Sequence, residues 1–527
     1  MAEHRTSSSD DLRDALQAAR PGDTISVFAG PYDRRCELRN LRATLAQPLL
    51  IRAGDQQWIS GGQIPNPNWG LGTPATDSPG SPSFAHFAFI AFRDCSYVVI
   101  EGLKLQDFWP SIFYFQNCDH ITIRGCALRD GTYAIFAKGE KTSYLLIEGN
   151  SWHQDSSRGH LLWTQIDWVE AHGDEGGHGT FRYFNGGFLA AKKIRGNVIV
   201  RRNLIADAYN GIHMKFDDAA PSDPTLAPSL NANVYIYENA FVRNRDNPIE
   251  PEVCAHNWHV RHNRLVDCHG WFSFDGVTGG YWYLYGNTGQ FRSRQGLPNM
   301  SAHTMGRVLK LSYQKDPRDV DSERTASLPW YVFNNSWYLR CPIIGGANGT
   351  LPSGGTLGQP VEGPDFVANL AFFNNAFVWC DLVQDGPWVC ELVELIRNFD
   401  AARSAGTTFD YDICDRPDYF DYFRNLGRGE TNGLLATEPI FVDGWGGQFD
   451  PAPQSAARDT GWVGAVGQPG TSDADIRMQG NGKLNRGAVQ DYGLIRVPAL
   501  EAQADRLLTE FGSPSVPPLP DEDDLRG

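Results

Sequence analysis

Five residues with side chains suited to acid–base chemistry recur at matching places in three short segments of this chain. They are His213, Lys215, Glu250, Glu252 and Asp275. In each segment the polar residues alternate with apolar ones, which is the pattern of a strand with one buried face. If the three segments lie side by side in one parallel sheet, equivalent residues are about 4.8 Å apart.

Two carboxyl groups at that separation do not both ionise easily. Lys215 lies in the strand next to Glu252, so it keeps Glu252 charged and favours a proton on Asp275. Cleavage of a glycosidic bond requires one ionised carboxyl group as nucleophile or base and one protonated group as acid. The sequence therefore predicts a glycosidase-type site here, with Glu250 and His213 beside it.

The same residues are compatible with other functions. A polysaccharide lyase removes a proton next to a substrate carboxylate, which requires a cation and a base, and Lys215 (or Lys310) and His213 would supply them. Alternatively, Lys215, Glu252 and Asp275 form a cross-strand charge ladder that only stabilises the sheet. A glycan-binding solenoid without catalysis is the third alternative.

A repeated phrase along residues 97–375 predicts the elements that position this site. Each copy has alternating apolar residues, then an anchor residue, then a second short strand about nine residues later. The tightest spacings between anchors are 23 and 24 residues, and the pattern has no helical period. The anchors are Leu103, Cys126, Asn150, Asn203, Asn239, Asn263, Asn287, Asn335 and Asn375. Such a repeat is typical of a parallel β-solenoid.

Stacking of the coils fixes which residues face the interior. The second strands predict one inward column of apolar residues, made of Ile112, Ile135, Ile212, Ile249 and Phe272. The coil after Asn239 needs one extra residue, because otherwise Glu250 would be buried in the core. We expect the asparagine anchors to align at one turn. The interrupted coil between 138 and 212 is expected to add Leu189 and Ala191 to the outward columns.

The outward columns of these strands also predict where a sugar binds. At the N-terminal end they hold Phe113, Phe115, Phe136 and Lys138. An exposed aromatic ring is a surface on which a sugar ring stacks. The insertion at 153–186 contains further aromatic residues, among them Trp163 and Trp168. It forms either a lid over the groove or a packed Ω-loop.

The chain divides into three parts. Residues 1–96 form an N-terminal cap and the first coils, with a helix predicted at Asp10–Arg20 over the open end of the solenoid. Residues 97–380 are the repeats with inserted loops, and residues 381–527 are irregular and close the other end. The prediction is an all-β parallel β-helix with a helical N-terminal cap and an irregular C-terminal cap.

Composition excludes several classes of partner. The formal net charge of −16 argues against nucleic acid, whose phosphates require a basic face. No run of 18 apolar residues is present, so no membrane span is expected. The first eleven residues lack the apolar core of a signal peptide. The protein is therefore cytoplasmic, or else secreted or periplasmic if a leader was removed, and its oligomeric state is not determined by the sequence.

Ten cysteines fit no CxxC metal or redox pattern. Cys95 and Cys118 each lie eight residues before an anchor, so they should stack on adjacent coils. We expect them to be unpaired core residues, since free cysteine is among the most buried residue types. A disulfide between them is the alternative.

Segments near both ends of the chain resemble a known superfamily. Asp11–Ile25 looks like the opening of right-handed parallel β-helix proteins that act on polysaccharides, notably the chondroitinase B and alginate lyase family. Pro439–Asp443, Phe449–Gly461 and Gly487–Gln490 resemble the closing coil of that superfamily. The resemblance implies a right-handed parallel β-helix and a poly- or oligosaccharide substrate. It implies little about the reaction, because one fold hosts many chemistries.

Glu250 and Glu252 resemble the two glutamates that hold calcium in that family. The family then has a lysine five residues later and an arginine on the next coil, whereas this chain has Asn257 and Asp275 at those places. These departures favour a hydrolase over a lyase. No metal ligand set is assigned from the sequence, no cofactor is required, and bound calcium is the one ion left open.

Overall fold

The computed structural model describes most of the repeat region and both caps. The described residues are 1–61, 88–154, 186–215, 231–252, 254–275, 278–290, 307–312, 329–339, 343–345, 370–379, 407–427, 429–463, 465–466, 476–477, 483–491, 493–512 and 518–520. Within them the chain is almost entirely β-structure.

Three long sheets of parallel strands form the body of the protein. Sheet A consists, in order, of β1 (Glu3–Thr6), β2 (Thr24–Val27), β4 (Leu49–Ala53), β7 (Ser96–Glu101), β10 (Asp119–Arg124), β13 (Ser143–Glu148), β16 (Gly196–Arg201), β19 (Ala232–Tyr237), β22 (Cys254–Arg261), β25 (Thr278–Tyr285), β28 (Trp330–Phe333), β31 (Leu370–Phe373) and β33 (Thr408–Asp410). Sheet B consists of β3 (Cys36–Arg39), β6 (Ile90–Arg93), β9 (Ser111–Gln116), β12 (Tyr133–Lys138), β15 (Gly187–Lys192), β18 (Asn210–Lys215), β21 (Ile249–Glu252), β24 (Gly270–Asp275), β27 (Arg307–Ser312) and β30 (Ile344–Gly345).

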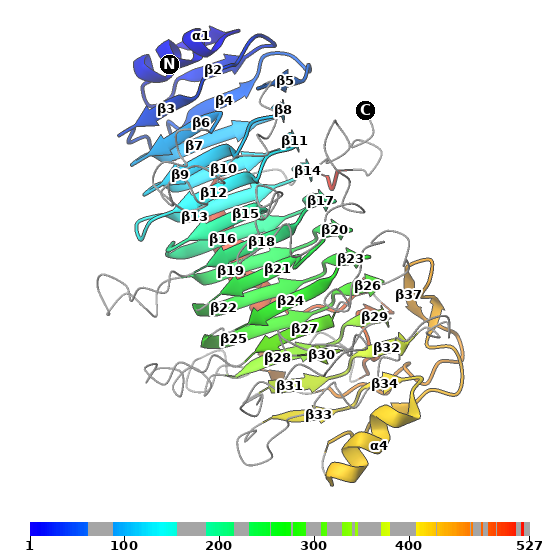
Figure 1. Ribbon diagram of the computed structural model, residues 1–527. Helices are drawn as coiled ribbons and strands as arrows, with labels where there is room; N and C mark the ends of the chain where they lie inside the picture. The colour runs from blue at the N-terminus through cyan, green and yellow to red at the C-terminus, as the bar shows by residue number, and fades with distance from the viewer. Residues whose placement is uncertain are drawn as a thin grey trace, which may run out of the picture.

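Sheet C is built from shorter strands. They are β5 (Ile59–Ser60), β8 (Lys104–Gln106), β11 (Ala127–Arg129), β14 (Ser151–His153), β17 (Leu204–Ala206), β20 (Ala240–Val242), β23 (Arg264–Val266), β26 (Thr288–Gln290), β29 (Ser336–Leu339), β32 (Ala376–Trp379), β34 (Ile413–Cys414) and β35 (Leu434–Leu435). From β4 to β30 each coil contributes one strand to each sheet, and each of these strands pairs in parallel with the strand of the next coil (Figure 1). The predicted parallel β-helix is confirmed.

An asparagine ladder runs through the turn between sheets A and C. The backbone N–H of Asn203 donates to Asn239 Oδ1 at 3.0 Å, and its side-chain Nδ2 donates to the same oxygen at 2.9 Å. The same double contact repeats between successive members, which are Asn150, Asn203, Asn239, Asn263, Asn287, Asn335 and Asn375. These side chains satisfy buried polar groups that the turn leaves without a strand partner. The predicted alignment of the anchors is confirmed.

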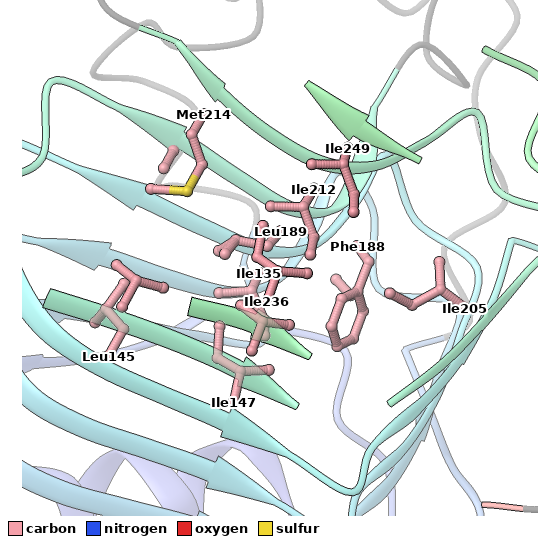
Figure 2. Packing of buried hydrophobic residues seen from close by; sticks show 14 of the residues in the cluster. Ile135, Leu145, Ile147, Phe188, Leu189, Ile205, Ile212, Met214, Ile236 and Ile249 are labelled. Atoms are coloured by element: carbon pink, nitrogen blue, oxygen red, sulfur yellow. The ribbon is translucent and has the colours of Figure 1, made fainter. Parts of the chain in front are cut away.

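The interior holds one continuous apolar column along sheet B. Ile135, Leu189, Ile212 and Ile249 are register partners and lie side by side in the core (Figure 2). Phe272 continues this column, as predicted. Cys95 and Cys118 are buried and are not joined in a disulfide.

The predicted register is wrong in two coils. Ile135 pairs with Phe113 and not with Ile112, although Ile112 is also fully buried. Leu189 points inward as the partner of Ile135, so Ala190 and Lys192 take the outward positions that were expected for Leu189 and Ala191. In both coils every residue near the start of the strand is apolar or small, so alternation alone does not distinguish the two registers.

Helices close both ends of the solenoid (Figure 1). At the N-terminal end, α1 (Ser9–Ala18) begins after Ser8, whose hydroxyl accepts a hydrogen bond from the Asp11 N–H at 3.1 Å. Its Leu12 and Leu16 are buried against the first coil. At the other end, α4 (Pro417–Leu426) adds Phe420 and Phe423 to the core.

The chain after residue 484 returns along the side of the solenoid. Leu500 of α5 (Pro498–Thr509) packs with Tyr283 and Tyr285 of sheet A, and Ala504 packs with Tyr235. Three short antiparallel pairs precede or join this return: β36 (Phe441–Asp443) with β37 (Gln448–Pro451), β38 (Ala465–Val466) with β39 (Ile476–Arg477), and β40 (Val489–Gln490) with β41 (Gly493–Leu494). Part of the predicted C-terminal cap therefore covers sheet A. None of the helices within the described ranges has the length and apolar character to cross a membrane.

Candidate functional site

The outer face of sheet B brings the predicted acid–base residues into neighbouring positions. Between β18 and β21 the register pairs His213 with Glu250 and Lys215 with Glu252. Glu250 directly follows Ile249 and Ser273 directly follows Phe272, and these two apolar residues are register partners. Ser273 in turn pairs with Lys310 of β27. Four successive coils thus place His213, Glu250, Ser273 and Lys310 in one row, which we call the central row.

Glu250 is the most enclosed ionisable residue of the central row. It is 5% exposed, although it lies on the outward side of its strand. Asn247 Nδ2 donates a hydrogen bond to Glu250 Oε1 at 3.0 Å. Lys310 Nζ lies 3.9 Å from the same oxygen, with a side chain that is 17% exposed. A cation and an amide donor together offset the cost of removing this carboxylate from water.

Two buried polar atoms of this site have no hydrogen-bond partner among the described residues. They are Ser273 Oγ and Asn247 Oδ1. Asn247 fits only because the next coil has glycine there, since a Cβ on Gly270 would lie 2.5 Å from Asn247 Oδ1. Buried polar atoms without partners are rare in proteins and call for a bound molecule or water. Asn247 also donates to Glu250, and Ser273 follows Glu250 in the central row on the next coil.

A second outward row lies two residues further along the same strands. Gln116, Lys138, Lys192 and Lys215 are successive register partners, and Lys215 pairs with Glu252. Asp275 occupies the corresponding place on β24, three residues after Phe272. The strand positions of Lys215, Glu252 and Asp275 are therefore adjacent, as predicted. Their side-chain contacts lie outside the described residues, and their catalytic roles remain predictions.

The predicted aromatic subsites are wrong for two residues. Phe113 and Phe115 were expected to point outward, but both are fully buried in the interior core. Ten residues, and not nine, separate Leu103 from the inward position, which shifts this strand by one residue. Tyr114 and Gln116 occupy the outward positions instead.

Phe136 lies on the outer face as predicted, but its ring is only 3% exposed. It stacks on Tyr114 with ring centroids 5.6 Å apart and contacts Tyr133 edge to face at 5.0 Å. In this conformation the ring is part of an apolar cluster on sheet B and does not offer an open face to a sugar. Lys138 stays partly exposed on the second row. Trp163 and Trp168 lie outside the described residues.

The described contacts of Glu250 are with nitrogen groups and not with the oxygen ligands that calcium takes. This ion takes six to eight oxygen ligands. Glu250 Oε1 instead faces an amide donor and a lysine ammonium, and the register places another lysine, Lys215, beside Glu252. Elsewhere in the described ranges no group of three or more His, Cys, Asp or Glu side chains is arranged to hold a metal ion.

Sequence reasoning assigned no role to Asn247 and Ser273, and considered Lys310 only as a substitute cation for a lyase. An insertion separates Lys310 in sequence from the other residues of the site. The regular spacing of the repeat therefore did not predict its contact with Glu250. Asn247 lies in the Asp246–Pro248 turn, which supplies the extra residue that keeps Glu250 outward. That extra residue was the sequence signal for the turn, but it did not indicate the hydrogen bond from Asn247 to Glu250.

Comparison with known proteins supports the fold. A family model described as a right-handed β-helix region matches residues 88–293. The predicted right-handed parallel β-helix is thus confirmed. No curated protein matches the sequence.

Several solved structures are similar to this one in outline. A mannuronic-acid-specific polysaccharide family 6 lyase from human gut microbiota is 11% identical, covers 83% of this chain and 92% of its own, and has a TM-score of 0.45. A lacto-N-biosidase from Eubacterium ramulus is 14% identical, with 55% and 64% covered and a TM-score of 0.29. A polygalacturonase from Erwinia carotovora ssp. carotovora is 8% identical, with 72% and 91% covered and a TM-score of 0.36. At these values we assign no chemistry to this chain from them.

Proposed function

We propose that this protein is a carbohydrate-active enzyme that hydrolyses a glycosidic bond of a poly- or oligosaccharide bound along the outer face of sheet B. The observation that carries the proposal is Glu250, an outward carboxylate that is 5% exposed and held by Asn247 and Lys310. Enclosed ionisable groups with specific partners concentrate at functional sites. The unpartnered Ser273 hydroxyl beside it adds a polar atom that a sugar hydroxyl would satisfy.

In this proposal Glu252 and Asp275 perform the bond chemistry. Asp275 donates a proton to the oxygen of the leaving sugar, and Glu252 attacks the anomeric carbon or removes a proton from the water that does so. The bond between the anomeric carbon and the bridging oxygen breaks, and water supplies the atoms for both new ends. Lys215, the register partner of Glu252, keeps that carboxylate ionised. Glu250, His213 and Lys310 bind and orient the sugar, and no cofactor is required.

A screen of defined polysaccharides tests this function. Neutral and uronate-containing chains are incubated with the protein, and new reducing ends are measured together with ultraviolet absorbance. Hydrolysis gives reducing ends alone. On a substrate that is cleaved, Glu252→Gln and Asp275→Asn should each lower kcat by orders of magnitude while substrate still binds, because acid and nucleophile act in the transition state.

The matched control is Glu101→Gln on sheet A. Glu101 is also an outward strand carboxylate, and it accepts hydrogen bonds from Arg124 at 2.7 and 2.9 Å. This variant should retain full activity. If Glu252→Gln and Asp275→Asn both retain nearly full activity as well, the second outward row is a structural charge ladder and the proposed site is wrong.

A lyase is the alternative that one observation favours. The second outward row presents Lys138, Lys192 and Lys215 on consecutive coils, and an acidic substrate would suit such a row. β-Elimination gives a new carbon–carbon double bond that absorbs ultraviolet light. A rise in absorbance during cleavage of a uronate chain would therefore show that the reaction is elimination and not hydrolysis. Lys215→Ala or His213→Ala would then abolish activity. Retention of glycan without any product would indicate a binding protein.

A further inference from the structure

A cleft lies at the N-terminal cap, between α1 and the first strand of sheet B. It has a volume of about 680 Å³, and five arginines line it: Arg13, Arg20, Arg35, Arg39 and Arg42. Glu37 is the one carboxylate among its lining residues in the described part of the chain. We propose that this cleft is an accessory binding site for an acidic oligosaccharide, whose carboxylate or sulfate groups the arginines bind.

Two segments of the chain, residues 13–20 and 35–42, bring these arginines to one volume. Arg13 and Gln17 are one turn apart on α1 and share a helical face, and Arg20 follows the C-cap residue Ala19; all three line the cleft. Arg35 directly precedes β3 and Arg39 is its last residue, and α1 packs against this strand. Arg42 follows in the next turn. Residues 34–42 are a basic run with four arginines and one glutamate, and the tertiary structure adds Arg13 and Arg20 to the three of these that line the cleft.

The existing ion pairs leave a net positive charge in the cleft. Arg13 pairs with Asp10 at 3.1 Å, and Arg42 with Asp119 at 3.4 Å. Glu37 is shared by Arg39 at 2.9 Å and Arg93 at 2.6 Å. Among the described residues, the side chains of Arg20 and Arg35 make no ion pair, and both residues are exposed. In a chain of net charge −16, such a cluster attracts anions to one place.

The lining favours an acidic sugar over other anions. Leu16, Leu38 and Leu41 give the cleft an apolar part, which suits the carbon face of a sugar ring. Guanidinium groups bind carboxylates and sulfates through paired hydrogen bonds in a fixed geometry. Arg39 also heads the second outward row, six strand spacings, or about 29 Å, from β21. One extended chain would therefore contact both places. That the ligand is a sugar rests on the proposed function, whereas the binding of anions does not.

Binding is measured by titration calorimetry of the full chain with a size-defined oligouronide, a sulfated oligosaccharide of the same length and a carboxyl-reduced neutral one. The test variant is Arg20→Gln/Arg35→Gln. The control is Arg34→Gln/Arg424→Gln, which removes the same charge from two exposed arginines outside the cleft. We expect the test variant to bind the acidic oligosaccharides about tenfold more weakly than the control, since two charge-assisted contacts are lost.

Three results would overturn the proposal: equal affinity of the two double variants, equal affinity for the neutral oligosaccharide, or affinity for sulfate ion or single-stranded DNA that matches the acidic sugars. Thermal melting checks that both variants are folded. Cleavage of a short substrate is followed in parallel and should be unchanged in the test variant, which leaves the site at β21 intact. Loss of the accessory site and failure of the proposed hydrolysis are therefore separate outcomes.

Discussion

The end of the asparagine ladder predicts a stability that depends on pH. Asp412 takes the next ladder position after Asn375, and its Oδ1 accepts hydrogen bonds from the Asn375 N–H at 2.7 Å and from Asn375 Nδ2 at 3.0 Å. Asp412 is fully buried and Glu430 is 8% exposed. Burial, together with the neighbouring Glu430 carboxylate, raises the pKa of Asp412 well above its usual value, and burial also raises the pKa of Glu430.

The structure gives the size of the effect. The Tyr419 hydroxyl is 3.4 Å from Asp412 Oδ2 and 2.6 Å from Glu430 Oε1. The two carboxyl groups are thus within about 6 Å, where two negative charges repel by about 3 kcal/mol at an effective dielectric constant of about 20. A carboxyl group whose pKa is raised on folding stabilises the protein most below its unfolded pKa, near 4. This stability is lost as the pH rises from that value through the folded pKa.

Asp412→Asn keeps the Oδ1 acceptor for the ladder and removes one of the two charges. We expect the variant to be more stable than the parent protein by about 1–3 kcal/mol at pH 8, where the repulsion is largest. The difference should vanish near pH 4, because the parent carboxyl groups are then protonated. The sign follows from the raised pKa values of both groups.

Thermal melts of both proteins from pH 4 to 9 measure this difference, with hydrogen exchange of residues 370–435 to locate it. Each kcal/mol corresponds to about 2–4 °C in a domain of about 200 residues and to less in a longer one. The control is Asp421→Asn, which removes an exposed carboxylate from α4. Parallel pH profiles of Asp412→Asn and the parent protein would refute the idea that repulsion between Asp412 and Glu430 lowers the stability at high pH.

Three further outcomes are expected. Asn239→Ala removes the acceptor of two buried N–H groups and should destabilise the protein by about 3 kcal/mol in chemical or thermal unfolding. Asn233→Ala, at a half-buried position of β19, should cost less. Phe113→Ala should cost about 3–5 kcal/mol because it opens a cavity in the core. With an active substrate, a chelator of calcium should leave kcat unchanged, because the described donors around Glu250 do not fit that ion; full loss of activity on chelation and its return with calcium would contradict this.

The sequence alone determined the architecture. In a solenoid, residues one repeat apart in sequence become neighbours in space, so the 23- and 24-residue spacings already placed Asn239, Asn263 and Asn287 in one ladder. The pairing of His213 with Glu250 and of Lys215 with Glu252 was predictable for a second reason. The cost of burying a carboxylate excluded the register in which Glu250 points inward.

Only the tertiary structure decided the details that no such cost constrains. Residues 112–115 are all apolar or aromatic, so a shift of one residue buries similar side chains, and the placement of Phe113 inside depends on the length of the preceding turn. Lys310 reaches Glu250 across an insertion, and the N-terminal cleft joins Arg13 and Arg20 with the arginines of residues 35–42. Such contacts arise between segments whose separation in sequence follows no repeat. The packing of the whole chain determines these contacts, and the spacing of residues along the sequence does not predict them.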